Sequence, residues 1–217
     1  MTEKKIIDLS IWMDEFTFPG NPVFQPNGPM NRVEGSNPEY VYDFELCSQS
    51  GTHIQGAHYF SESGKKINEF PLERFQGNAY IMDVKKRGED ITLEDVEKEL
   101  DSVDLTGRIL IFRTGHMDEL IKDQYIDPKR RPGLSIEAAR YLCEEKKVNM
   151  LAIDSIGLES RVSQNYEVNV YLCSKEILIL ECITNLDRIN GKEVFLEAFP
   201  LKIKGVEGTP CRAIAKV

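Results

Sequence analysis

The sequence predicts one α/β domain that spans residues 1–217. A chain of this length can enclose one full hydrophobic core, and its 41% hydrophobic and 9% aromatic residues are ordinary for a globular protein. Segments typical of strands and of helices alternate through the second half of the chain. We find no internal repeat, low-complexity tract or linker that would divide the chain.

The first quarter of the chain is expected to consist of strands and a long loop. Residues 5–11 are predicted to form a strand. Residues 16–30 carry prolines and glycines that fix turns and forbid a helix. Residues 40–47 alternate and are rich in β-formers, which predicts a strand leading into the polar run 48–58.

The remaining elements follow a strand, helix, strand rhythm. A helix at 92–100 has Thr92 as its N-cap, and a helix at 135–146 begins with the capping residue Ser135. A third helix is expected at 166–173 and an edge or hairpin region at 193–204. Further strands are predicted at residues 79–84, 108–112, 150–153, 177–182 and 212–217.

The charge balance excludes some partners. With 27 Lys and Arg against 36 Asp and Glu, the net charge is -9, whereas nucleic acids and anionic membranes attract basic surfaces. No signal-peptide pattern opens the chain, and apolar runs such as residues 177–180 are too short to span a bilayer. The five cysteines form no CxxC pair. We therefore expect a soluble, cytoplasmic protein with reduced thiols and a small-molecule substrate.

The polar run 48–58 holds the strongest candidate residues. Alternate side chains of an extended segment share a face, so Gln49, His53 and Gln55 should converge, with Gly51 allowing close approach of a ligand. His53 can act as a general acid or base near neutral pH. Glu181 ends the apolar run ILIL, where a buried carboxylate needs a partner, and His53 could supply it.

Nine segments resemble, in order and spacing, the cyclase family of metal-dependent hydrolases, which includes bacterial kynurenine formamidases and isatin hydrolases. They cover nearly the whole chain. The segments are IIDLS (6–10), PGNP (19–22), SGTH (50–53), PLERFQG (71–77), FRTGH (112–116), PGLSIEAARYL (132–142), LAIDSIG (151–157), ECITNLDRI (181–189) and FPLKIKGVEGTPCRAIA (199–215).

The resemblance also shows where the chain departs from the family. The family's metal motif is HxGTHxDxPxH, and this chain reads QSGTHIQGAHY at 49–59. Gln49 replaces the first ligand, Gln55 replaces the Asp, and Tyr59 replaces the catalytic His, while His53 is kept. A later His and Glu pair of ligands becomes Asn169 and Glu181. Because an amide oxygen is a weaker metal ligand than imidazole or carboxylate, a tightly held binuclear centre is not expected. Any metal would be one weakly bound zinc or manganese on His53 and Glu181.

Other candidates keep two interpretations each. Tyr59 could donate a proton or form an aromatic wall. His58 could be catalytic only if the loop shifts, because neighbouring residues of an extended chain point to opposite sides. His116 could line the pocket or lie in an exposed loop. The pair Arg130 and Arg131 could bind an anion or form a solvated basic turn.

The amides and the N-terminal aromatic residues complete the predicted site. Gln49, Gln55 and Asn169 each offer donors and an acceptor and are expected to bind substrate. Trp12 and Phe16 could cap the pocket, since the resemblance implies that this region encloses the substrate, often across a subunit contact.

The resemblance implies a mixed β-barrel-like core flanked by helices, of the swivelling β/β/α type, and a homo-oligomer. We expect an enzyme acting on a small carbonyl compound by ring closure, dehydration, isomerisation, or amide or lactone hydrolysis. His53 would be the acid or base, Glu181 would orient it, and Tyr59 would donate a proton. The alternatives are a non-catalytic ligand-binding pseudoenzyme and a mononuclear metal-dependent amidohydrolase.

Overall fold

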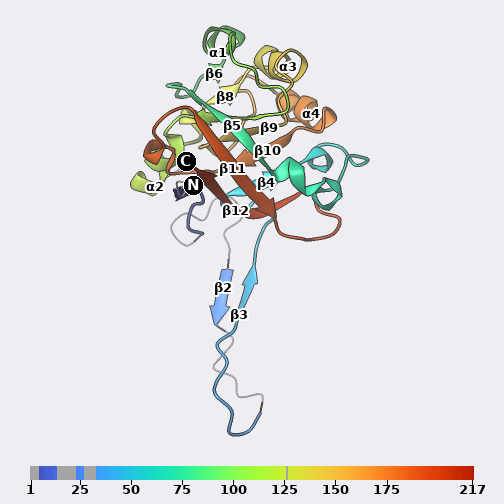
Figure 1. Ribbon diagram of the computed structural model, residues 1–217. Helices are drawn as coiled ribbons and strands as arrows, with labels where there is room; N and C mark the ends of the chain where they lie inside the picture. The colour runs from blue at the N-terminus through green and yellow to red at the C-terminus, as the bar shows by residue number, and fades with distance from the viewer. Residues whose placement is uncertain (1–4, 14–22, 27–32, 126) are drawn as a thin grey trace.

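A closed, mixed β-sheet forms the centre of the computed structural model, which describes residues 5–13, 23–125 except 27–32, and 127–217. The eight strands follow the order β1-β12-β11-β5-β7-β9-β10-β4, and β12 also pairs with β4, which closes the sheet into a barrel (Figure 1). The strands are β1 (Ile6–Asp8), β4 (His53–Gln55), β5 (Gln76–Asp83), β7 (Ile109–Arg113), β9 (Met150–Ile153), β10 (Leu178–Glu181), β11 (Glu193–Pro200) and β12 (Gly208–Lys216). The mixed α/β fold and its barrel-like core are therefore confirmed.

Four neighbouring strands of this sheet, β5, β7, β9 and β10, are parallel. Parallel neighbours need crossover connections, which explains the strand, helix, strand rhythm of the sequence. β11 lies between β5 and β12, so the region around residues 193–204 is a hairpin with β12 and not an edge of the sheet. The carboxyl ends of parallel strands meet at one edge, where ligands commonly bind in open α/β sheets.

Alternating side chains of the parallel strands build two cores. Ile109, Ile111 and Leu180 belong to the cluster that fills the barrel. Leu110, Phe112 and Ile179 belong to the second cluster, between the outer face of the sheet and the helices. Because β10 alternates, Glu181 faces the helix-covered side together with Ile179.

Helices α1 (Leu93–Leu100), α3 (Ile136–Glu144) and α4 (Glu167–Ser174) cover the outer face of the sheet (Figure 1). Thr92 accepts a hydrogen bond from Asp95 N, and Ser135 accepts one from Ala138 N, so both predicted N-caps are confirmed. Within the described ranges, no helix has the length and apolar character needed to cross a membrane.

Several elements were missing from the sequence prediction. Helix α2 (His116–Asp123) has Gly115 as its N-cap, with a φ of 72° and no side-chain cap, so the sequence shows no capping residue at its start. Strand β2 (Val23–Pro26) lies within the region predicted as loop and pairs with β3 (Tyr42–Glu45). A short parallel pair, β6 (Asp90–Ile91) with β8 (Gly133–Leu134), lies beside the main sheet.

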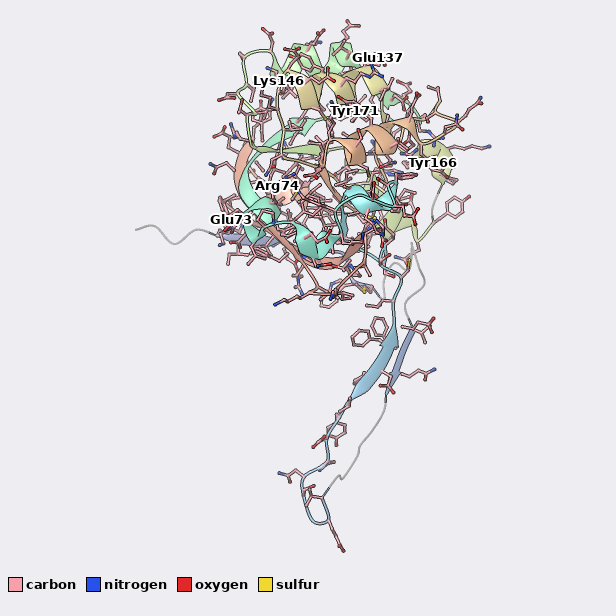
Figure 2. All side chains as sticks on the ribbon, turned by 90° about the vertical axis from the view of Figure 1, so that its right-hand side faces the viewer. Glu73, Arg74, Glu137, Lys146, Tyr166 and Tyr171 are labelled. Atoms are coloured by element: carbon pink, nitrogen blue, oxygen red, sulfur yellow. The ribbon has the colours of Figure 1, made fainter. Side chains whose placement is uncertain are left out.

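The β2–β3 pair forms an arm that extends away from the barrel (Figures 1 and 2). The rings of Phe24 and Phe44 lie 6.3 Å apart on it, yet both side chains remain largely exposed, as do those of Tyr40 and Tyr42. A two-stranded hairpin without a core of its own is marginally stable in water. The arm therefore presents an unburied aromatic surface.

Candidate functional site at the carboxyl end of the parallel strands

Polar residues gather where the parallel strands end. Glu181 ends β10, Asp154 and Ser155 follow β9, and Thr114 follows β7. All four are buried, as is His53 on the neighbouring strand β4. Buried polar groups need partners, so this edge of the sheet is where the fold maintains a polar interior.

The cross-strand register places His53 directly opposite Glu181. The Nε2 atom of His53 lies 3.4 Å from Oε2 of Glu181, and the two residues are 2% and 7% exposed. The Nδ1 atom of His53 lies 2.8 Å from the carbonyl oxygen of Gly51. Because a carbonyl only accepts, Nδ1 carries a proton, and in the neutral ring Nε2 holds a free lone pair.

The two facing atoms do not form a hydrogen bond, and Nε2 of His53 is buried with no hydrogen-bond partner among the residues that the structure describes. Two acceptors held this close need a cation between them, which is either a proton on one of them or a metal ion. Oε1 of Glu181 is held separately by the backbone N–H of Leu158, at 3.3 Å. The pair is thus positioned to exchange a proton or to hold a cation.

Two amide groups lie on the same side of the sheet. Gln55 shares the strand face of His53, since both alternate with the barrel residue Ile54. Asn169 lies on α4, whose neighbouring residue Val168 packs in the outer core. The oxygen atoms Oε1 of Gln55 and Oδ1 of Asn169 are buried and have no hydrogen-bond partner within the described ranges, so both acceptors are available to a ligand.

Glu159, which the sequence did not single out, orients Asn169. Its Oε2 atom accepts hydrogen bonds from the backbone N and from Nδ2 of Asn169, both at 2.9 Å, and its Oε1 accepts from Val168 N. Because Nδ2 donates to Glu159, the amide oxygen faces the other way. The same carboxylate also stabilises the N-terminus of α4, which has no side-chain cap.

Tyr59 belongs to a short 3₁₀ turn, Ala57–Tyr59, after β4. Burial raises the pKa of its phenol, and the negative charges of Glu181 and Glu207 raise it further, so the hydroxyl stays protonated. Its ring contacts Phe60 edge-on at 4.6 Å, and Phe60 lies 5.3 Å from Tyr166. These rings form an aromatic side of the site beside the N-terminus of α4. Tyr166, labelled in Figure 2, is exposed at the surface.

Gln49 and His58 are held by local contacts. Gln49 lies in a turn and not in the strand, and its Nε2 donates to Oε1 of Glu207 at 3.2 Å. Ser48 Oγ donates to the same carboxylate oxygen. The extended segment is therefore limited to His53–Gln55. The half-buried His58 has its Nδ1 atom 3.0 Å from the carbonyl oxygen of Ser61.

His116 is not in an exposed loop. It is the first residue of α2, is fully buried, and its Nδ1 lies 2.8 Å from Ser155 Oγ. Its Nε2 has no partner. Burial, followed by the positive charge of Arg87, lowers the pKa of His116 to about 4, so the ring is neutral.

Asp154 fixes the turn before His116. It accepts hydrogen bonds from Thr114 N, Thr114 Oγ1 and Gly115 N at 2.6 to 2.7 Å. Burial raises the pKa of Asp154 to about 7 in spite of these bonds.

Of the two N-terminal aromatic candidates, the structure describes Trp12. Trp12 is 64% exposed and borders two hollows, of about 570 and 460 Å³, that it shares with Asp8 and Ser10. Neither hollow is lined by His53 or Glu181. Phe16 lies outside the described residues.

The fold and site together define a barrel-cored α/β protein with a buried acid–base pair at the carboxyl end of its parallel strands. A sequence model of the Cyclase family, described as "Putative cyclase", matches residues 7–160. This is well over half of the chain, which therefore belongs to the cyclase family of metal-dependent hydrolases.

Known proteins resemble the chain over its whole length. Kynurenine formamidase from Bacillus cereus (strain ATCC 10987 / NRS 248) is 26% identical over 223 residues, covering 100% of this chain and 99% of the relative. The kynurenine formamidase of Geobacillus thermodenitrificans is 27% identical, covering 95% of each chain. Isatin hydrolase A from Labrenzia aggregata, bound to benzyl benzoate, superposes with a TM-score of 0.84 at 20% identity, covering 99% of this chain and 94% of that one. Isatin hydrolase A from Ralstonia solanacearum gives 0.82 at 19% identity, covering 99% and 92%.

Proposed function

We propose that this protein is an acid–base enzyme that acts on a small carbonyl compound, closing or hydrolysing an amide or lactone. The observation that carries the proposal is the buried pair of His53 Nε2 and Glu181 Oε2, which lie 3.4 Å apart. Two buried amide oxygens without partners among the described residues lie on the same side of the sheet. The similarity to kynurenine formamidases and isatin hydrolases supports a hydrolase acting on small carbonyl compounds.

In this mechanism His53 accepts the proton of the attacking group through Nε2, while the Gly51 carbonyl holds the proton on Nδ1. Glu181 stabilises the imidazolium that forms. Tyr59, kept protonated, donates to the oxygen that develops negative charge. His53 then returns its proton to the leaving group. Ring closure with loss of water is the reverse of ring opening, so the same groups serve both directions.

The donor set fits one divalent ion better than two. His53 and Glu181 would hold such an ion, with the amide oxygens of Gln55 and Asn169 as additional neutral donors. No third His, Cys, Asp or Glu joins them to form a metal-binding group in the described part of the chain. Two cations would lack the anionic charge that bridges and offsets them. When bound, one ion would polarise a carbonyl oxygen.

We therefore propose that turnover does not depend on the family's binuclear centre. The test compares protein stripped with a chelator and protein reloaded with zinc or manganese, on matched small amides and lactones. Equal rates support acid–base catalysis by the chain itself. Abolition by the chelator and rescue by either metal would refute it and favour a metal-dependent amidohydrolase, and elemental analysis would count the ions.

A non-catalytic binding protein is the second candidate, because the free acceptors of Gln55 and Asn169 could serve ligand binding alone. The double variant His53→Ala with Glu181→Ala separates the two functions. If the protein is an enzyme, the wild type turns over substrate and the double variant does not. If it is a binding protein, neither shows turnover and the double variant still binds the ligand.

We also propose that the protein is a cytoplasmic homo-oligomer. All five cysteines are free thiols, which fits a reducing compartment. The aromatic side chains exposed on the β2–β3 arm would gain burial against a second copy of the chain. Sedimentation of the full chain against a Phe24→Ser, Phe44→Ser variant tests this assembly, and a monomeric wild type would refute it.

A further inference from the structure

Arg131 is a partly buried cation that forms no ion pair with any of the described residues. It directly follows the turn Pro128–Arg130 and lies half-buried. Its Nη1 atom donates to the carbonyl oxygens of Pro132 and Gly157, each at 3.2 Å. Among the described residues, no carboxylate oxygen lies at ion-pair distance from this guanidinium. Its neighbour Arg130 differs, since it pairs with Glu119 at 2.9 Å.

The guanidinium lies beside the acid–base pair. A methyl group added to Gly157 would lie 3.8 Å from Arg131 Nη1 and also 3.8 Å from Glu181 Oε1. Arg131 and Glu181 therefore flank the same point of the backbone. Gly157 has a φ of 140°, a conformation that favours glycine, so the chain keeps this point free of a side chain.

A second arginine adds to the positive charge. Burial lowers the pKa of Arg131, and the charge of Arg161 lowers it further, while Glu181, Glu159 and Asp90 act in the opposite direction. The Nε atom of Arg161 is buried without a partner.

The nearby carboxylates have other partners. Asp90 accepts from Ser160 Oγ at 2.5 Å and from Arg161 N at 2.6 Å, and Glu159 accepts from the first turn of α4. Glu181 is turned toward His53 and Leu158 N. The two guanidiniums thus keep donors that no carboxylate in the described part of the chain fills. Partial burial of two positive charges without a counter-ion is costly, and a bound anion would offset this cost.

We propose that Arg131, assisted by Arg161, binds the carboxylate of the substrate. The substrate class is then a small carbonyl compound that carries a carboxylate group, placed so that its reacting carbonyl lies toward His53. Arginine suits this role because its planar group of donors matches a carboxylate and its position is already fixed by two carbonyl oxygens. The inference rests on the proposed function, since it takes the His53 and Glu181 region as the substrate site.

The test uses two matched probes, 2-formamidobenzoate and its methyl ester, which differ in one negative charge. Binding is measured by calorimetry and turnover by release of formate. A charge-assisted contact makes the wild-type protein bind the acid roughly 10-fold to 100-fold more tightly than the ester. Arg131→Gln should remove this preference, Arg131→Lys should keep part of it, and Arg161→Gln should reduce it.

Arg130→Gln is the matched control, because it removes the same charge one residue away, and the preference for the acid should persist. Equal binding of acid and ester by the wild type, or an equal loss in Arg130→Gln and Arg131→Gln, overturns the carboxylate site. The ratio between the probes does not respond to a purely structural defect, and Arg161→Gln provides a second variant if Arg131→Gln fails to fold.

If the acid is bound through Arg131 but neither probe is hydrolysed, the carboxylate site stands and the proposed catalysis fails. If both probes are hydrolysed without a preference for the acid, the proposed catalysis stands and the carboxylate site fails.

Discussion

His53 and Glu181 are cross-strand neighbours whose facing atoms lie 3.4 Å apart without a hydrogen bond between them. The strand register creates this relationship, since β4 is the strand that follows β10 in the closed barrel. The Gly51 carbonyl fixes the ring of His53, and Leu158 N fixes the carboxylate of Glu181. The backbone thus holds both members of the pair in place before any ligand binds.

Replacing either member of this pair should remove most of the activity. We expect His53→Ala and Glu181→Gln each to lower kcat/KM by roughly 10²-fold to 10⁴-fold, because each loses the proton transfer that the pair performs. The double variant should be little worse than the poorer single variant, since residues that act as a unit are not additive. Steady-state kinetics on one amide substrate measures all three.

Thermal unfolding of the same variants checks that they fold. Additive losses in the double variant would contradict a coupled pair, and full activity in His53→Ala would contradict the assignment of His53.

The pair itself was within reach of sequence reasoning, since Glu181 ends an apolar run and a buried carboxylate needs a partner. The N-caps Thr92 and Ser135 were also predictable, because capping depends on residues three positions apart. Strand β9 was predicted with its observed bounds from local hydrophobicity alone.

The partners of the site residues were not predictable in the same way. Glu207 contacts Gln49 across most of the chain, and the pairing of β12 with β4 in the barrel brings the two together. Glu159 contacts Asn169 from the loop just before α4, where no sequence pattern marks it as a partner of the helix. Helix α2 was missed because Gly115 replaces the usual polar N-cap. The convergence of Gln49 with His53 was assumed from an extended segment that the turn at residues 48–52 interrupts.

Two substitutions of Tyr59 distinguish its two interpretations. If the phenol donates a proton, Tyr59→Phe should lower kcat roughly 10-fold to 100-fold with little change in KM, because the ring and its contact with Phe60 are kept. If Tyr59 is only an aromatic wall, Tyr59→Phe should keep full activity and Tyr59→Ala should raise KM. Kinetics of both variants on one substrate decide between the roles.

Glu159 should matter for stability as well as for the site. Glu159→Ala removes the acceptor of three hydrogen bonds at the start of α4, and we expect a loss of about 2 kcal/mol in the free energy of unfolding. Glu167→Ala is the control, since this exposed carboxylate lies in the same first turn and should cost less than about 1 kcal/mol. Urea unfolding compares the two, and equal losses would show that Glu159 acts only through the helix dipole.

His116 should make the protein sensitive to acid in a way that a substitution reveals. Its pKa falls from 6.5 to about 4 in the folded state because the ring is buried. Between these two pH values the unfolded chain binds a proton at His116 and the folded protein does not. The stability that the neutral ring contributes is therefore fully present above pH 6.5 and is lost as the pH falls through about 4. At about 1.4 kcal/mol for each pKa unit, the loss approaches roughly 3 kcal/mol.

Asp154 acts with the opposite sign in the same pH range, so a difference measurement is needed. Its pKa is raised to about 7 by burial, and its contribution, present below the unfolded value of 3.8, is lost as the pH rises through about 7. Subtracting the unfolding free energies of His116→Asn from those of the wild type, at each pH, cancels Asp154 and the exposed carboxylates. As the pH falls from 6.5 to 4, the unfolding free energy of the wild type should decrease by roughly 3 kcal/mol relative to that of His116→Asn. A difference that stays constant over this range would show that folding does not lower the pKa of His116.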